Sequence, residues 1–246
     1  MTFDYINYIK GIIKPNYFIP LNYSNNYGFD SIGRESFDST LLNETNELNK
    51  TIAIANEEIE GNIFYTRKQT CIDIKPEPYF VLQTRRRNIS RVAPYINSVL
   101  EIGLNGGHSA LFWLTLNKNI KYYGVDICEH KYTTLAADFL KKKFKDRFTF
   151  FKGDSTVILP GLVNHIKDNV DLIVIDGGHS SEIASQDFTN SFMISKDLGS
   201  KFILVDDSDE MPIHKLILKI IFSGKVSSET LSNTWESEKQ ILLRIN

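Results

Sequence analysis

The sequence contains few cysteines and no long apolar run, and its opposite charges nearly cancel. Its 246 residues include two cysteines, Cys71 and Cys128, too few for a disulfide framework or a zinc knuckle, so we expect a reducing compartment. No run of about 18 apolar residues occurs, which predicts no membrane span. The formal net charge of −2 gives no electrostatic reason to expect a nucleic-acid ligand. The first residues lack a basic region followed by an apolar run, so we expect a cytoplasmic location.

What the sequence does contain is typical of a folded protein, with 42% hydrophobic and 24% charged residues. Its texture changes near residue 76. The segment 1–76 is rich in Asn, Tyr, Ser and Glu, and it predicts a helix over 43–58 and a short strand over 62–66. A unit so small and polar buries too little apolar surface to fold alone. We therefore expect this N-terminal extension to lie against the rest of the chain as a lid, or against a second subunit as the arm of a homodimer.

Residues 77–246 show a regular alternation of strand and helix patterns. Pro78 suits the first turn of a helix, with Arg85–Arg87 on or beside its polar face. Strands are then predicted at 98–102, 121–125, 148–151, 170–175 and 201–205, with helices at 109–116, 131–143, 156–166, 181–195 and 212–222. Two further strands, 225–231 and 239–245, are placed to form a hairpin. The pattern predicts a three-layer α/β fold with a mostly parallel, seven-stranded sheet and a terminal antiparallel hairpin.

Acidic residues mark the ends of all five predicted parallel strands. One such residue is unremarkable, because Asp is a common turn and helix-capping residue. In an open α/β sheet, however, ligands bind outside the carboxyl ends of the strands. Five ends in succession therefore predict a row of carboxylates along one crevice: Glu101, Asp126, Asp154, Asp176 and the pair Asp206-Asp207.

The first of these turns reads Glu101-Ile-Gly-Leu-Asn-Gly-Gly-His-Ser109. Its glycines allow a sharp turn, and the helix that follows offers its N-terminus to an anion. The dinucleotide pattern G-x-G-x-x-G would need glycines at positions that hold Asn105 and His108, so hydride transfer ranks last. Asp126, at the end of the next strand, suits the two hydroxyls of a ribose. We expect the His108 side chain to face solvent.

On these residues, the stretch from Ser98 to Ser208 resembles the class I S-adenosylmethionine-dependent methyltransferases. The resemblance implies that the first turn holds the methionine part of the cofactor, that Asp126 binds the ribose hydroxyls, and that Asp154 meets the adenine amino group. The cofactor-binding residues that follow from it are Glu101, Gly103, Asn105, Gly106, Gly107, Ser109, Asp126, Asp154, Ser155 and Asp176.

A narrower resemblance lies in Ile175-Asp-Gly-Gly-His179, which is similar to the D-G-x-H motif of a subgroup of small-molecule O-methyltransferases. Several members of that subgroup act on sugars or other natural products, and some bind magnesium. The resemblance implies that Asp176, Asp206 and Asp207 hold Mg²⁺ or another divalent cation and that His179 is the general base. Asp206 and Asp207 can reach one ion only if the chain leaves the strand there, since consecutive side chains in a strand point to opposite faces.

Plainer interpretations remain for each feature. His179 could cap or pack the next helix, Asp176 could serve the cofactor alone, and Asp206-Asp207 could form a solvated turn. For Arg85–Arg87 we expect an exposed helix face rather than a substrate contact. Two other functions stay open. One is a metal-independent methyltransferase acting on N or O of another substrate, and the other is a catalytically silent cofactor-binding scaffold.

Overall fold

The computed structural model describes residues 27–29, 35–37, 39–68, 72–208, 210–229 and 240–246. Residues 1–26 of the predicted extension and Cys71 lie outside them, as do the outer ends of the two hairpin strands. Within the described part of the chain, no helix combines the length and the apolar character that crossing a bilayer would require.

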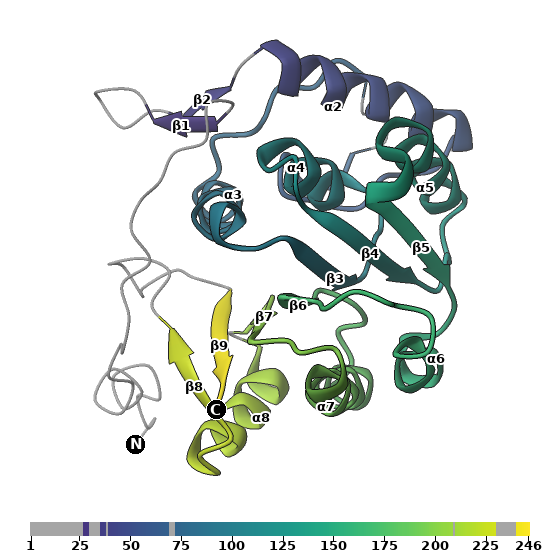
Figure 1. Cartoon of the computed structure of the whole chain (residues 1–246). Coiled ribbons are helices and arrows are strands. Elements are labelled where there is room, and N and C mark those ends of the chain that lie inside the picture. Colours follow the sequence, from purple (N-terminus) through teal and green to yellow (C-terminus); the bar gives the residue numbers. More distant parts are fainter. Residues whose placement is uncertain (1–26, 30–34, 38, 69–71, 209, 230–239) are drawn as a thin grey trace.

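A seven-stranded sheet forms the centre of the molecule, and its strands lie in the order β5-β4-β3-β6-β7-β9-β8 (Figure 1). The first five pair in parallel, and β9 pairs antiparallel with both β7 and β8. The strands are β3 (Ser98–Ile102), β4 (Lys121–Asp126), β5 (Phe148–Lys152), β6 (Leu172–Ile175), β7 (Phe202–Val205), β8 (Val226–Glu229) and β9 (Ile241–Ile245). This confirms the predicted fold class, including the terminal hairpin.

Helices cover both faces of the sheet. One layer holds α2 (Ser39–Ile52), α3 (Phe80–Val92), α4 (His108–Leu116) and α5 (Lys131–Phe144). The other holds α6 (Ser155–Leu162), α7 (Ser181–Asp197) and α8 (Met211–Phe222), drawn below the strands in Figure 1. The alternation of side chains along the strands divides the apolar core between these layers. In β3, for example, Val99 packs on the α4 side, whereas Leu100 and Ile102 pack on the α7 side.

The described part of the N-terminal extension shares a core with the sheet. Leu41, Leu48 and Ile52 of α2 are fully buried, and they join the same apolar cluster as Trp113 of α4. Ahead of α2, the strands β1 (Tyr27–Phe29) and β2 (Glu35–Phe37) pair antiparallel as a separate two-stranded sheet. The extension thus obtains its apolar burial by packing on the helical layer rather than within itself.

Three local predictions in this region are wrong. The helix predicted over 43–58 is α2, which ends at Ile52 and is followed by a 3₁₀ turn, because Asn56 takes a left-handed backbone with φ of 54°. The strand predicted over 62–66 is a loop, since the Asn62 side chain accepts hydrogen bonds from the following backbone amides. Finally, Pro78 precedes helix α3 rather than lying in its first turn, because the extended residue Tyr79 caps that helix.

Candidate active site

A cavity of about 860 Å³ lies at the carboxyl edge of the parallel strands. It is bounded by the loop after β3, by the segments that follow β4, β5 and β6, by α3, and by residues 60–67 of the extension. Of the predicted carboxylates, the cavity is lined by Asp126, Asp154, Asp176 and Asp207. The strand order reverses between β3 and β6, and the carboxyl ends of the strands around this switch point bring most of the predicted row together.

The glycine loop after β3 is fixed by close packing of backbone on backbone. Gly103 has a φ of +98°, and a Cβ atom there would lie 1.9 Å from the carbonyl oxygen of Asp176. Gly107 has a φ of +77° and precedes the first residue of α4. Both positions need glycine, because a side chain would clash or force a disfavoured backbone. The sharp turn aims the amino end of α4 toward the cavity, which Gly106 and Ser109 also line.

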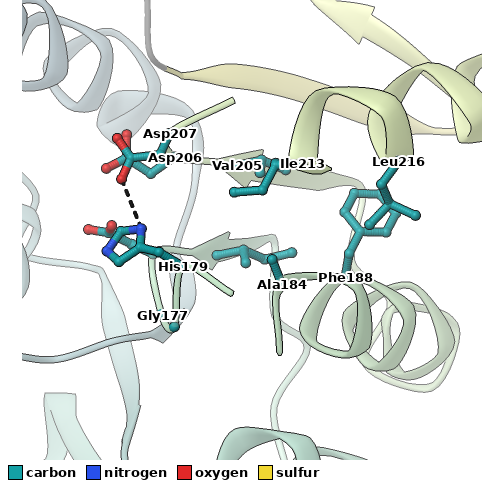
Figure 2. A pocket seen from close by; sticks show the side chains of 12 residues that line it. Gly177, His179, Ala184, Phe188, Val205, Asp206, Asp207, Ile213 and Leu216 are labelled. Atoms are coloured by element: carbon teal, nitrogen blue, oxygen red, sulfur yellow. Dashed lines mark ion pairs between the residues drawn. The ribbon is translucent and has the colours of Figure 1, made fainter. Parts of the chain in front are cut away.

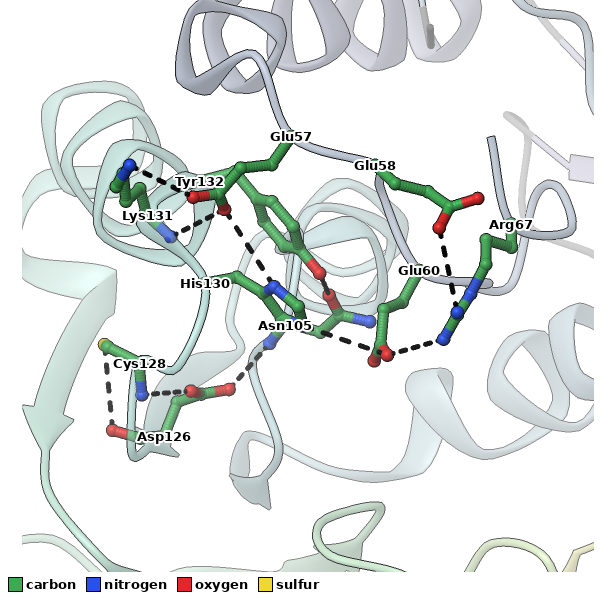
Figure 3. Close-up of polar contacts among 10 residues, drawn as sticks. All are labelled: Glu57, Glu58, Glu60, Arg67, Asn105, Asp126, Cys128, His130, Lys131 and Tyr132. Atoms are coloured by element: carbon green, nitrogen blue, oxygen red, sulfur yellow. Dashed lines mark hydrogen bonds and ion pairs between the residues drawn. The ribbon is translucent and has the colours of Figure 1, made fainter. Parts of the chain in front are cut away.

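Asp126 joins this loop to the end of β4 (Figure 3). One of its carboxylate oxygens accepts a hydrogen bond of 2.8 Å from the backbone amide of Asn105, and the other accepts one of 2.7 Å from that of Cys128. The Tyr132 hydroxyl donates to the side-chain oxygen of Asn105 at 2.8 Å. The carboxylate is thus held at the cavity wall by two amides, and its remaining lone pairs can accept hydrogen bonds from a ligand.

Glu101 lies inside β3 rather than at its end and is absent from the cavity wall. Its carboxylate accepts hydrogen bonds from Ser109 Oγ at 2.9 Å and from the Tyr122 hydroxyl. Burial raises the pKa of this carboxyl to about 7, although both hydrogen bonds oppose that shift. The geometry gives Glu101 a supporting place, tying the first turn of α4 to the sheet.

Asp154 and Ser155 lie at the start of α6, where both line the cavity. The Asp154 side chain caps the helix by accepting from the backbone amide of Thr156 at 2.9 Å. The capping interpretation therefore holds for this residue, and the cap uses only one of its two carboxylate oxygens.

His108 is buried, which contradicts the expectation that its side chain faces solvent. Its Nε2 lies 2.9 Å from both the Tyr65 hydroxyl and the Asn49 side-chain oxygen. Burial lowers the pKa of His108 to about 3, so the ring is neutral. The exposed-turn prediction failed because residues from the extension cover this loop.

Asp176, Asp206 and Asp207 form a compact acidic cluster, with one ligand oxygen of each within 4.8 Å of the others. The chain does leave the strand, since β7 ends at Val205 and Asp207 has a φ of 45°. Both aspartates of the pair therefore reach the same place. Figure 2 shows them at the left of a small pocket whose apolar side chains, among them Phe188, Ile213 and Leu216, extend to the right.

Burial in this apolar surrounding raises the pKa of Asp176 to about 7 and that of Asp206 well above its ordinary value. Arg85 opposes both shifts. Its Nη2 lies 2.7 Å from an Asp206 carboxylate oxygen and 2.8 Å from one of Asp207. The expectation that Arg85–Arg87 form an exposed face is wrong for Arg85, and also for Arg86, which is fully buried and donates to the backbone oxygen of Glu77.

His179 lies at the mouth of the same cluster. Its Nδ1 is 3.2 Å from an Asp207 carboxylate oxygen, the contact drawn as a dashed line in Figure 2. The hydrogen bond to Asp207 raises the pKa of His179, and partial burial opposes the shift. The side chain remains 61% exposed, so the ring is accessible from the cavity.

The cluster suits a divalent cation on its donor chemistry and its charge. Carboxylate oxygens are the donors that Mg²⁺ prefers, and two or three of them suffice because the ion keeps several waters. Ionised together, Asp176, Asp206 and Asp207 would carry three negative charges against the single charge of Arg85. A divalent cation would compensate the excess negative charge of the ionised carboxylates. Without it, burial favours their protonated, neutral forms.

Several lining residues were not identified from the sequence. Arg85 and Leu82 of α3 line the cavity, as do Tyr65 and other residues of the extension. The extension also contacts both α5 and the glycine loop, since Glu57 accepts from the backbone amide of Lys131 at 2.9 Å (Figure 3) and the Gly61 carbonyl accepts from the Asn105 side chain at 3.4 Å. No local motif marks these residues, because their place depends on long-range packing. The Arg triplet was the one available indication.

Comparison with known proteins agrees with this geometry. Residues 100–208 match a family model described as a methyltransferase domain. An O-methyltransferase from Bacillus cereus, solved with S-adenosylhomocysteine, aligns over 85% of this chain and 92% of its own, with a TM-score of 0.59 and 16% identity. The O-methyltransferase TomG from Streptomyces achromogenes, solved with S-adenosylmethionine, aligns over 85% and 90%, with a TM-score of 0.54 and 14% identity. No curated protein matches by sequence. At these identities the solved structures establish the shared fold.

Proposed function

We propose that this chain is a class I S-adenosylmethionine-dependent methyltransferase that methylates a hydroxyl oxygen of a small molecule with the help of a divalent cation. One observation carries the proposal. The same cavity that holds the glycine loop, Asp126 and Asp154 also contains Asp176, Asp207 and His179 at its other end. A cofactor bound along the first group would point its reactive end toward the second.

The cofactor end follows from the loop geometry. The close contact between Gly103 and the Asp176 backbone would shape a cradle for the methionine part, which Asn105, Gly106 and Ser109 would continue. Gly107 is not part of the cavity wall and would act through the turn that it allows. Asp126 would accept the ribose hydroxyls, and Asp154 with Ser155 would meet the adenine. Glu101 would act indirectly, by holding Ser109.

The acceptor end supplies proton transfer and orientation. Asp176, Asp206 and Asp207 would hold the cation, which would orient an acceptor hydroxyl and lower its pKa. His179 would take the hydroxyl proton on its exposed nitrogen, Nε2, while Asp207 fixes the ring through Nδ1. The sulfonium leaving group needs little acid assistance, so alignment of oxygen, methyl carbon and sulfur would supply most of the acceleration.

For the acceptor we propose a small molecule with a sugar or sugar-derived hydroxyl. The cavity volume of about 860 Å³ lies within the range typical of small-molecule sites. Beside His179, the wall offers the carboxylate of Asp207 and the guanidinium of Arg85, both suited to a polyol. The sugar itself rests on the D-G-x-H resemblance.

A second candidate, metal-independent methylation, is favoured by the Arg85 ion pairs. A guanidinium already compensates part of the charge on Asp206 and Asp207. Under this alternative Asp176 and the pair would be structural, and His179 would act alone. Titration calorimetry with Mg²⁺, in the presence and absence of S-adenosylhomocysteine, separates the two. Cation binding together with loss of turnover in EDTA supports the first, and EDTA-insensitive turnover supports the second.

The function is tested by methyl transfer from labelled S-adenosylmethionine to a panel of sugar and other hydroxyl acceptors. His179→Ala should lower kcat by about a hundredfold or more while S-adenosylhomocysteine still binds. His165→Ala is the matched control, because that histidine is exposed and lies outside the cavity wall. Full activity in His179→Ala would remove the base from the mechanism, and a chain that binds no S-adenosylhomocysteine would contradict the function itself.

A further inference from the structure

The guanidinium of Arg85 is a cation in direct contact with the acidic cluster of Asp176, Asp206 and Asp207. A single nitrogen of Arg85, Nη2, contacts carboxylate oxygens of both Asp206 and Asp207, at 2.7 and 2.8 Å. Arg85 comes from α3, more than a hundred positions earlier in the chain, and its side chain is 17% exposed. This is therefore a largely enclosed contact, not a surface ion pair.

The guanidinium is held there by the packing of its helix. Leu82, one turn earlier on α3, is buried, and the next residue, Arg86, is fully buried. Arg86 donates to the backbone oxygens of Ile63 and Glu77, which attaches α3 to the extension. Arg85 is thus presented to the cluster by a fixed element.

The same oxygens are the natural ligands of a divalent ion at this place. A Mg²⁺ ion binds carboxylate oxygens at about 2.0–2.1 Å and keeps water on its other positions. A guanidinium in direct contact with two of the ligand carboxylates competes for their lone pairs. It also places a like charge within a few ångströms of the ion, in a partly enclosed site where repulsion is weakly screened.

We propose that Arg85 is the resident cation of this cluster and that it competes with a divalent ion for Asp206 and Asp207. The inference rests on the cation site of the proposed function. In this proposal the Arg85 side chain has two positions. Without the ion it pairs with the aspartates, and with the ion bound it turns into the cavity, whose wall it already forms. There it can donate hydrogen bonds to acceptor oxygens.

The test is titration calorimetry of the full chain, saturated with S-adenosylhomocysteine, with MnCl₂ as the probe. Arg85→Gln removes the competing charge, so we expect Mn²⁺ to bind about tenfold tighter or more than to the wild type. Arg87→Gln is the matched control, because it removes the same charge from the same helix and lies outside the cavity wall. It should stay within about threefold of the wild type.

Equal or weaker Mn²⁺ binding by Arg85→Gln would overturn the competition and leave the methyltransferase function standing. Absence of Mn²⁺ binding by both the wild type and Arg85→Gln would instead overturn the cation requirement, and the competition with it. If Arg85→Gln fails to fold, the wild type decides. In the NMR spectrum of the wild type, the side-chain Nε–Hε resonance of Arg85 should shift when Mg²⁺ is added in place of Mn²⁺. A resonance that stays in place at saturating Mg²⁺ overturns the proposal.

Discussion

The Tyr65 hydroxyl lies 2.9 Å from Nε2 of His108, so the N-terminal extension is hydrogen-bonded to the first residue of α4. Asn49 completes a buried group of three, because its side-chain oxygen lies 2.9 Å from the same nitrogen and accepts from the Tyr65 hydroxyl. That amide oxygen can only accept, so Nε2 donates to it in the tautomer that carries the proton on this nitrogen. The extension thereby supports the glycine loop that precedes α4.

Removing this hydroxyl should loosen that attachment. Tyr65→Phe leaves the ring packing intact but removes a buried donor, and we expect the free energy of unfolding to fall by about 1–2 kcal/mol. Chemical denaturation measures the change. Tyr79→Phe, at a side chain that is 56% exposed, is the control and should stay within about 0.5 kcal/mol of the wild type. Equal stabilities for the two variants would show that the buried group contributes nothing.

The close approach of Gly103 to the Asp176 backbone predicts an intolerant position. Gly103→Ala places a Cβ atom 1.9 Å from a backbone oxygen at a φ of +98°, so neighbouring strand ends must move apart. We expect a loss of about 3 kcal/mol or more in unfolding free energy and weaker binding of S-adenosylhomocysteine.

A second glycine serves as a control for that variant, because its substitution by alanine should raise the free energy of unfolding instead of lowering it. Gly161 lies within α6, and a Cβ atom there meets nothing within 4 Å. Gly161→Ala should therefore stabilise the protein by about 0.5–1 kcal/mol, because alanine favours the helix. A tolerated Gly103→Ala, measured beside it, would argue against the described loop.

Asp126 is predicted to determine cofactor affinity. Asp126→Asn replaces a carboxylate oxygen that accepts from a backbone amide by an NH₂ group, and it removes charge-assisted bonding to ribose hydroxyls. Calorimetry should show S-adenosylhomocysteine binding about tenfold weaker or more. Asp138→Asn, the same change on the exposed side of α5, should leave the affinity unaltered. If both variants bind like the wild type, Asp126 is not a cofactor contact.

Glu101 should make stability depend on pH. Burial raises the pKa of Glu101 to about 7 from its ordinary 4.5, so between these values the folded state holds a proton that the unfolded state releases. The free energy of unfolding therefore falls as the pH rises across that interval, by roughly 3 kcal/mol from this group.

Comparison with Glu101→Gln isolates that effect. The wild type should be more stable, relative to the variant, below pH 4.5 than above pH 7, as denaturation across the pH range would show. Glu47→Gln, at an exposed position of α2, should follow the wild type at every pH. A wild type that parallels Glu101→Gln throughout would mean that the carboxyl is not shifted by burial.

The pattern of apolar residues along the sequence was sufficient to predict the strands of the sheet. The apolar runs before Asp126, Asp176 and Asp206 predict buried strands, and the structure has β4, β6 and β7 there. Local pattern suffices for these strands because burial on both faces demands continuous apolar residues. It also places the glycine loop and the D-G-x-H segment, since strand ends of a parallel sheet meet at one edge.

The same local patterns failed where side chains find distant partners. Arg86 has the composition of an exposed helix residue, yet it is fully buried against backbone carbonyls of residues 63 and 77. His108 is similar, because its cover comes from Asn49 and Tyr65. The residues adjacent to Arg86 and His108 in the sequence do not indicate any of these partners.

The sequence by itself therefore determined the sheet, the order of its elements and the residues available at its carboxyl edge, since these depend on periodicity and turn chemistry. The tertiary structure decided what each of those residues faces. In the structure, Glu101 hydrogen-bonds Ser109 instead of lining the cavity, the extension covers the glycine loop, and Arg85 pairs with both Asp206 and Asp207. Charges so far apart in the chain are brought together by the burial of apolar helix faces, a property of the whole core rather than of any segment.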